Sequence, residues 1–221
     1  MKILDQLVDY DNEASVGNSF RDKRFSFFKS KIAALNKPMK ILDIGGTFSY
    51  WSKRGFQDNP DYHITLVNIK SKKLSCENII TVEGDATNLV EFPDNHFDLV
   101  YSNSVIEHLF TEDNQVKMAN EVKRLSKYHF IQTPNLYFPI EPHYLIPFFQ
   151  FLPFQWRLFI ITKTKLSKGK KVKDIRFAKK NIREKRLLSL KQFKSMFPNS
   201  KIYKEKFYGI NKSFVAHNLP D

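Results

Sequence analysis

Two adjacent glycines form the first place where this chain could do chemistry. Residues 40–44 have the pattern of a buried strand that contains one acid, Asp43, and Gly45 and Gly46 follow it directly. Adjacent glycines let the backbone bend sharply and let a ligand approach where a Cβ would stand in the way. In open α/β sheets such a turn lies at the carboxyl ends of the strands, where ligands bind. The turn therefore predicts a ligand site, although an ordinary strand-to-helix turn has the same pattern.

Two histidines and a glutamate could move protons. His108 follows a second apolar run at residues 97–102, and Glu141 and His143 lie in a stretch rich in aromatic residues and proline. Histidine titrates near neutral pH and can serve as a general base. A structural role in hydrogen bonding or loop packing is the alternative for both histidines. No cluster of His, Cys or Asp has metal-ligand spacing along the chain, so we expect no metal site.

Short apolar runs alternate with helical segments and would position these residues. We predict strands at residues 40–44, 62–69, 78–82, 97–102 and 128–133, with helical segments at about 50–55 and 105–125. A helix over residues 13–35 precedes them, and a helix at 190–197 and strands at 201–207 and 213–217 follow. This order predicts an α/β fold with a doubly wound, mostly parallel seven-stranded sheet, an antiparallel closing hairpin and a helical, aromatic insertion after the fifth strand.

Length and charge divide the chain into four parts of one domain. We expect a helical cap at residues 1–37, a core at 38–133, an insertion at 134–186, and a closing helix and hairpin at 187–221. Residues 163–186 contain twelve Lys or Arg and two acids, and they carry most of the net charge of +13. The core is nearly neutral, so an argument for nucleic-acid binding from overall charge does not apply. A single cysteine, Cys76, excludes an internal disulfide and fits a reducing compartment.

Four segments in order resemble the class I S-adenosylmethionine-dependent methyltransferases. They are residues 41–46 (ILDIGG), Asn68 at the end of the second strand, residues 83–86 (EGDA) and residues 97–109 (FDLVYSNSVIEHL). The last segment is similar to the strand-four signature of the small-molecule branch, and the resemblance covers residues 38–133. It implies a Rossmann-like fold and S-adenosyl-L-methionine as the cofactor.

The resemblance also implies a role for each cofactor-binding residue. Asp43 would lie under the glycine turn near the methionine amino group, and Gly45 and Gly46 would give the cofactor access to the backbone. Asp85 would accept a hydrogen bond from the adenine amino group. The backbone of Ala86 would lie beside the adenine ring.

The ends of the second and fourth strands would complete this site. Ser102 and Asn103 would line the methionine moiety of the cofactor. Asn68 stands where the family usually has an acid that binds two ribose hydroxyls. An asparagine can accept one hydrogen bond and donate one, so we expect weaker cofactor binding, and tighter binding with an aspartate at this position.

The implied reaction is methyl transfer to a hydroxyl or carboxyl of a small molecule, a sugar or a lipid-linked intermediate. Its candidate catalytic residues are His108, at the acceptor side of the fourth strand, and Glu141 and His143, in an insertion that could close over the site. Methylation of a cytosine carbon needs an activated cysteine, and Cys76 is away from the expected site. The Asn/Asp-Pro-Pro-Tyr loop used for exocyclic amines is missing.

Residues 134–186 leave the partner and location open. Aromatic residues at 148–161 followed by lysines suit a segment that lies on an anionic membrane, and a second small core with solvated lysines is the alternative. The aromatic stretch is too interrupted for a membrane-spanning helix. An RNA methyltransferase or RNA-binding protein is less favoured, because no RNA-binding module accompanies the lysines. A degenerate cofactor-binding protein without catalysis is also open. We expect a cytoplasmic protein without a signal peptide, peripheral at the membrane if these lysines bind lipid.

Overall fold

The computed structural model describes residues 16–71, 74 and 76–221. Within these residues, seven strands form one sheet in the order β3-β2-β1-β4-β5-β9-β8. The strands are β1 (Met39–Ile44), β2 (Tyr62–Asn68), β3 (Ile79–Glu83), β4 (Phe97–Asn103), β5 (Ser126–Pro134), β8 (Lys201–Phe207) and β9 (Ile210–His217). Strands β1 to β5 pair in parallel, whereas β9 is antiparallel to both β5 and β8. The predicted mostly parallel sheet with its closing hairpin is confirmed.

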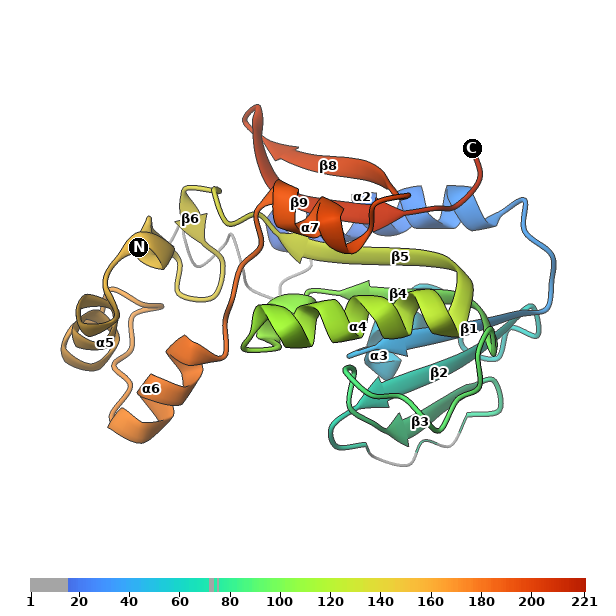
Figure 1. Cartoon of the computed structure of the whole chain (residues 1–221), viewed down its shortest axis with the longest axis horizontal. Coiled ribbons are helices and arrows are strands. Elements are labelled where there is room, and N and C mark those ends of the chain that lie inside the picture. Colours follow the sequence, from blue (N-terminus) through green and yellow to red (C-terminus); the bar gives the residue numbers. More distant parts are fainter. Residues whose placement is uncertain (1–15, 72–73, 75) are drawn as a thin grey trace.

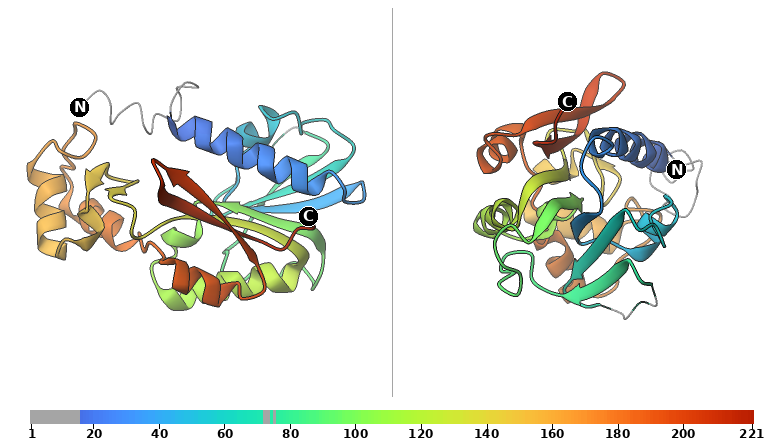
Figure 2. Two further views of the ribbon diagram at one scale, coloured as in Figure 1. Left: turned by 90° about the horizontal axis from the view of Figure 1, so that it is seen from above. Right: turned by 90° about the vertical axis from the view of Figure 1, so that its right-hand side faces the viewer.

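Helices cover both faces of the sheet (Figure 2). The helices α2 (Val16–Ile32) and α3 (Phe48–Ser52) lie on one face, and α4 (Glu112–Leu125) and α7 (Leu190–Met196) lie on the other. Because successive strand residues point to opposite faces, Ile41 packs with Phe28 of α2 while Leu42 packs with Met118 of α4. This three-layer arrangement buries the parallel strands on both sides, as their nearly continuous apolar sequences require.

The strand order reverses between β1 and β4, which places a crevice at their carboxyl ends. The glycine turn follows β1, and the 3-10 helix η1 (Ile106–His108) follows β4. Residues 105–125 thus form two helical segments with a break between them, as predicted. The second segment begins at α4, where the Thr111 side chain accepts a hydrogen bond from the backbone of Asn114.

The insertion forms a lobe beyond the carboxyl ends of the strands (Figure 1). It contains β6 (Ile140–Glu141), β7 (Ile146–Pro147), η2 (Phe149–Phe151), α5 (Phe154–Lys163) and α6 (Ile175–Arg183). Tyr144, Phe149, Ile161, Ala178 and Ile182 form a core of its own in the lobe. This finding agrees with the interpretation that the aromatic residues make a second small core, but it accounts for only part of them.

Several element boundaries differ from the prediction by one to three residues, those of the hairpin and of the first helix among them. Strand β9 begins at Ile210 rather than at residue 213, because Tyr208 and Gly209 adopt positive φ angles and close a tight hairpin. The helix predicted over residues 13–35 is α2, which ends at Ile32, and residues 1–15 lie outside the described residues.

Candidate functional site

Both glycines of the turn after β1 are required by their surroundings. Gly45 has a φ of +78°, and a Cβ placed there would lie 2.4 Å from Cγ2 of Val105. A Cβ on Gly46 would lie 1.9 Å from Oδ2 of Asp43. The Asp43 carboxylate therefore lies directly beneath the turn, at the position predicted for it.

Asp43 is buried at the switch point of the sheet. Its Oδ2 accepts a hydrogen bond of 2.7 Å from Nε1 of Trp51. Burial raises the pKa of the Asp43 carboxyl to about 8, although the bond from Trp51 opposes this shift. A cationic ligand group close to Asp43 would favour its ionised form, and the amino group of S-adenosylmethionine is such a group.

The ends of β2 and β3 offer acceptor oxygens to the same crevice. The side-chain amide of Asn68 donates to the carbonyl of Gly46 at 2.9 Å, so an aspartate there would set a carboxylate against that carbonyl. The expected gain from an acid at this position stays a prediction. Asp85 is exposed, and its Oδ1 accepts from the backbone and hydroxyl of Thr87. Ala86, beside it, is buried.

Ser102 and Asn103 both form hydrogen bonds with protein groups. Ser102 is fully buried, and its hydroxyl donates to the carbonyl of Ile44 at 3.0 Å. The side chain of Asn103 accepts from the guanidinium of Arg24. Ser102 thus ties β4 to β1, and the role of both residues in lining the methionine moiety stays a prediction.

Arg24 is a buried cation that links the N-terminal helix to the closing hairpin. Its guanidinium donates to both carboxylate oxygens of Glu205 on β8, at 3.0 and 2.7 Å. The hydroxyl of Ser213 on β9 donates to the same carboxylate. This ion pair was not predicted from the sequence. The position of Arg24 within the apolar stripe of the predicted helix was the one sign that the residue would be buried and would need an anionic partner.

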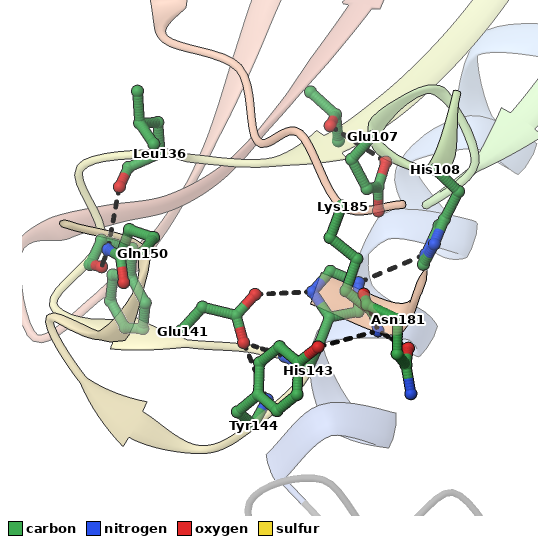
Figure 3. A network of polar contacts seen from close by, with 11 residues as sticks. Glu107, His108, Leu136, Glu141, His143, Tyr144, Gln150, Asn181 and Lys185 are labelled. Carbon is green, nitrogen blue, oxygen red and sulfur yellow. Dashed lines mark hydrogen bonds and ion pairs between the residues drawn. The ribbon is translucent and has the colours of Figure 1, made fainter. Parts of the chain in front are cut away.

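A second polar cluster joins the turn after β4 to the insertion (Figure 3). Nδ1 of His143 lies 2.7 Å from Oε1 of Glu141, and Nε2 of His143 lies 3.2 Å from Nε2 of His108. The backbone amides of His143 and Tyr144 donate to the other Glu141 oxygen. The three predicted catalytic residues are therefore brought together.

Glu107 belongs to this cluster and was missed in the sequence. Its side chain is fully buried, Oε2 accepts from the Thr133 hydroxyl at 3.1 Å, and Oε1 has no partner among the described residues. Burial raises the pKa of Glu107 to about 7, and the bond from its own backbone opposes this shift. Burial, followed by the charges of His143 and Lys185, lowers the pKa of His108 to about 4. His108 is therefore neutral at pH 7.

The fold also assembles a set of metal-ligand atoms that the sequence spacing did not predict. One ligand atom from each of Glu107, His108 and His143 lies within 4.8 Å of the others. His143 is 35 residues from His108 along the chain, so only the return of the insertion to η1 brings them together. Cys76, in contrast, contacts Asn78 beside the first residue of β3, at the opposite edge of the sheet.

A cavity of about 110 Å³ opens at the carboxyl ends of the strands, and none of the four cluster residues lines it. It lies between α2, the strand ends, the insertion and the hairpin, and its lining includes Arg21, Arg24, Gln132 and Lys212. Ser104 and Pro142, which also line it, are close in sequence to the two halves of the cluster. The cavity thus offers an acceptor site with apolar walls and several polar or cationic groups.

The end of the insertion is fixed to the turn that carries Glu107. The backbone amide of Arg186 donates to the Glu107 carbonyl at 2.7 Å. Gln115 of α4 donates to the carbonyls of both Ile106 and Arg186. The lobe is therefore connected to the cluster at its last residue as well as through His143.

Comparison with known proteins identifies the core of the chain. Residues 42–129 match the family model of a methyltransferase domain. The chain is 44% identical over 54 residues to an uncharacterised protein of Mycobacterium tuberculosis and 35% identical over 85 residues to the phosphoethanolamine N-methyltransferase of Plasmodium falciparum. These stretches are 24% and 36% of this chain, but only 18% and 32% of the two relatives.

The fold resembles solved structures over most of its length. The methyltransferase domain of bacterial CtHen1-CN is 14% identical and has a TM-score of 0.55, with 91% of this chain and 100% of that chain covered. At this level of identity the likeness concerns the fold. The α/β architecture predicted from the sequence is therefore shared with a methyltransferase domain.

Proposed function

Since residues 42–129 match the family model of a methyltransferase domain and the fold is shared with such a domain, we propose that this chain transfers the methyl group of S-adenosylmethionine to an oxygen of a small acceptor molecule. The observation that carries this proposal is the Glu141–His143–His108 cluster, which the insertion and the turn after β4 bring together at the carboxyl edge of the sheet. The acceptor class is a hydroxyl or carboxyl of a small molecule, sugar or lipid-linked intermediate.

The residues at the strand ends fit the cofactor. The glycine turn would admit it to the backbone, Asp43 would attract its amino group, and Asn68 would accept from a ribose hydroxyl through Oδ1. Asp85 would accept from the adenine amino group. S-adenosylmethionine supplies a sulfonium methyl group, which is transferred when an acceptor oxygen attacks it in line.

The chain's own residues would align the acceptor and take its proton. Glu141 holds Nδ1 of His143, and Nε2 of this ring, which lies 3.2 Å from Nε2 of His108, would accept the proton of an acceptor hydroxyl that takes the place of His108 there. Alignment can contribute up to about 7–11 kcal/mol in well-oriented reactions, and a general base adds typically about 10²–10⁴-fold. His108, neutral at pH 7, would orient the His143 ring until the acceptor binds.

The test follows methyl transfer from labelled S-adenosylmethionine to panels of hydroxyl, carboxyl and amine compounds. We expect an oxygen acceptor to be methylated, and His143→Ala to lower its turnover about 10²–10⁴-fold with unchanged cofactor affinity by calorimetry. His63→Ala, which removes an exposed histidine of β2, is the matched control. Methylation of amines alone, or no cofactor binding at millimolar concentration, would contradict the proposal.

We also propose that the lobe holds the protein at an anionic membrane surface. Several large apolar side chains of the lobe are about half exposed or more: Phe148, Phe151, Trp156, Phe159, Leu166, Ile175 and Phe177. Trp156, Phe159 and Ile175 line one open apolar groove with Lys163. Monomeric proteins rarely expose large apolar patches without a partner.

The positive charge of the lobe favours an anionic lipid surface as that partner. Lys163 lines the apolar groove, and the same lobe carries further exposed cations: Lys165, Lys168, Lys170, Lys171, Lys173, Arg176, Lys179 and Lys180. Each Lys or Arg near an anionic bilayer adds about 1 kcal/mol of attraction, and aromatic rings suit the headgroup level. Within the described ranges every helix is too short or too polar to span a bilayer. RNA binding by the same lysines is the competing proposal, and exposed apolar rings favour the lipid.

A further inference from the structure

The Glu107 carboxylate is a buried acceptor with one oxygen unused. Its side chain is fully buried, and Oε1 has no hydrogen-bond partner among the described residues. A buried polar group without a partner costs about 1–3 kcal/mol, and more if it is charged. The proposed methyl transfer gives this oxygen no role. Figure 3 shows Glu107 on the same side of the cluster as the two imidazole rings.

The two imidazoles have the separation of two ligands of one ion. Nitrogen ligands lie roughly 2.0–2.1 Å from Zn²⁺, so two of them at angles of about 90–110° are roughly 2.8–3.4 Å apart. The Nε2 atoms of His108 and His143 are 3.2 Å apart, and the ring planes are nearly perpendicular, at 89°. A hydrogen bond between the same two Nε2 atoms also accounts for this distance. If the proton of His108 moves to Nδ1, both Nε2 atoms have a free lone pair, and an ion can bind between them.

Glu141 orients His143 as an outer carboxylate orients a metal-binding histidine. It accepts from Nδ1 of His143 at 2.7 Å, which fixes the tautomer and leaves Nε2 with a lone pair. Two backbone amides hold the second Glu141 oxygen in place. The histidine is therefore prepared for ligation before any ion is present.

We propose that Glu107, His108 and His143 bind one divalent first-row transition-metal ion through Oε1, Nε2 and Nε2. Two imidazoles and one carboxylate suit Zn²⁺, Co²⁺, Mn²⁺ or Fe²⁺ rather than Mg²⁺, which prefers oxygen ligands. Three protein ligands leave positions open for water or for the acceptor.

Its chemical role rests on the proposed methyl transfer. An acceptor hydroxyl bound to the ion would have a lowered pKa and would release its proton to water, and the resulting oxygen anion would attack the methyl group. The new O–C bond forms as the C–S bond breaks, and the electron pair of the C–S bond stays on sulfur. With the ion bound, His143 is a metal ligand and no longer a general base. The ion then activates the acceptor hydroxyl in its place.

Nearby cations set the affinity of the site. The ammonium of Lys185 is bonded to Asn181 and lies 3.4 Å from the Tyr144 hydroxyl, and its charge acts on His108. The charge of Arg24 acts on Glu107. The positive charges of Lys185 and Arg24 both repel a metal ion, so removal of the Lys185 charge should raise the affinity for the ion. If the cluster were only structural, this substitution would not change metal affinity.

The experiment titrates the untagged full-length protein with Co²⁺ and records its d–d absorption, with Zn²⁺ and Mg²⁺ followed by calorimetry. We expect one Co²⁺ or Zn²⁺ per chain and no Mg²⁺. Glu107→Gln and His143→Ala should each weaken binding tenfold or more, and Glu141→Gln should weaken it about 10–100-fold. Lys185→Met should strengthen it, and His63→Ala should leave it unchanged. Circular dichroism checks that each variant is folded.

Two results would overturn the metal site. One is the absence of stoichiometric Co²⁺ binding to folded wild-type protein at micromolar concentration. The other is binding that Glu107→Gln and His143→Ala leave unchanged. If methyl transfer then persists in a chelator, the proposed function stands without the ion. If Co²⁺ binds as expected but S-adenosylmethionine does not, the metal site stands and the proposed function fails.

Discussion

At the scale of single residues, Asp43 shows how the fold changes the chemistry of a common side chain. Its carboxyl is buried beneath the glycine turn and bonded to Trp51, and its pKa is raised from 3.8 to about 8. The folded chain therefore holds a proton on Asp43 that the unfolded chain releases above about pH 4. Between pH 4 and pH 8 this group makes the folded state less stable as the pH rises.

Asp43→Asn should remove this dependence. The amide oxygen can still accept from Trp51, and it needs no proton to remain neutral. We expect the melting temperature of the variant, relative to the wild type, to rise as the pH is raised from 5 to 8. Thermal unfolding followed by circular dichroism at three pH values measures the difference. A difference that is the same at every pH would show that Asp43 is ionised in the folded chain.

Single residues were predictable where their neighbours in sequence determine their environment. Asp43, Gly45 and Gly46 lie within one turn of each other in sequence, and the resemblance of this segment to the methyltransferases implied the place of the carboxylate under the glycines. Glu107 was missed because its partners, Thr133 and His143, come from β5 and the insertion. Ser102 was placed on the correct strand, but the register that gives its hydroxyl to Ile44 is a property of the assembled sheet.

At the scale of elements, α2 is joined to the closing hairpin by a buried ion pair. The side chains of Arg24 and Glu205 are only 5% and 2% exposed, so neither charge can turn to solvent if its partner is lost. Breaking such a pair on one side costs about 3–5 kcal/mol, while replacing both partners by apolar residues is often neutral. The pair thus makes the position of α2 depend on β8.

Arg24→Met should destabilise the protein by about 3–5 kcal/mol because it leaves the Glu205 carboxylate buried without its cation. Adding Glu205→Leu to the same chain should restore a large part of the loss. Urea unfolding measures both. Lys117→Ala, which breaks an exposed pair with Asp113, is the control and should cost less than about 1 kcal/mol. A loss of that small size for Arg24→Met would mean that solvent reaches Glu205.

Elements were predictable in the core and less so outside it. The parallel strands are continuous apolar runs with clear ends, and each was placed within about two residues. The helices α5 and α6 were expected only as a helical insertion without boundaries, because prolines and aromatic residues mask the 3.6-residue period. The ion pair between α2 and β8 spans 181 residues of sequence, and no local pattern can specify such a partner.

At the scale of the whole molecule, the lobe should decide where the protein resides. We expect the chain to float with vesicles of phosphatidylglycerol and phosphatidylcholine, and not with phosphatidylcholine alone. High salt should release it, since the attraction of exposed charges is screened. Exchange of Lys168, Lys170, Lys171 and Lys173 for Glu should abolish binding, as should Trp156→Ser with Phe159→Ser.

A charge-matched variant makes this result specific. Exchange of the exposed Lys127, Lys191, Lys194 and Lys204 for Glu changes the net charge equally, but it leaves the lobe intact and should preserve flotation. No flotation of the wild type at low salt would rule out the membrane surface. If the same lobe variants instead abolish binding to single-stranded RNA at physiological salt, the lysines serve the competing RNA partner.

The hydrogen bond from the backbone amide of Arg186 to the carbonyl of Glu107 makes the insertion and the core depend on each other. An insertion attached only at its two ends could be shortened, exchanged or lost while the parent domain kept its chemistry. Here the last residue of the basic segment supports the turn that carries Glu107 and His108, and the lobe itself contributes His143. A graft or deletion that spans 137–186 would remove Glu141 and His143 from the cluster and loosen the turn that carries Glu107 and His108. The lobe and the core must therefore be inherited, and engineered, as one unit.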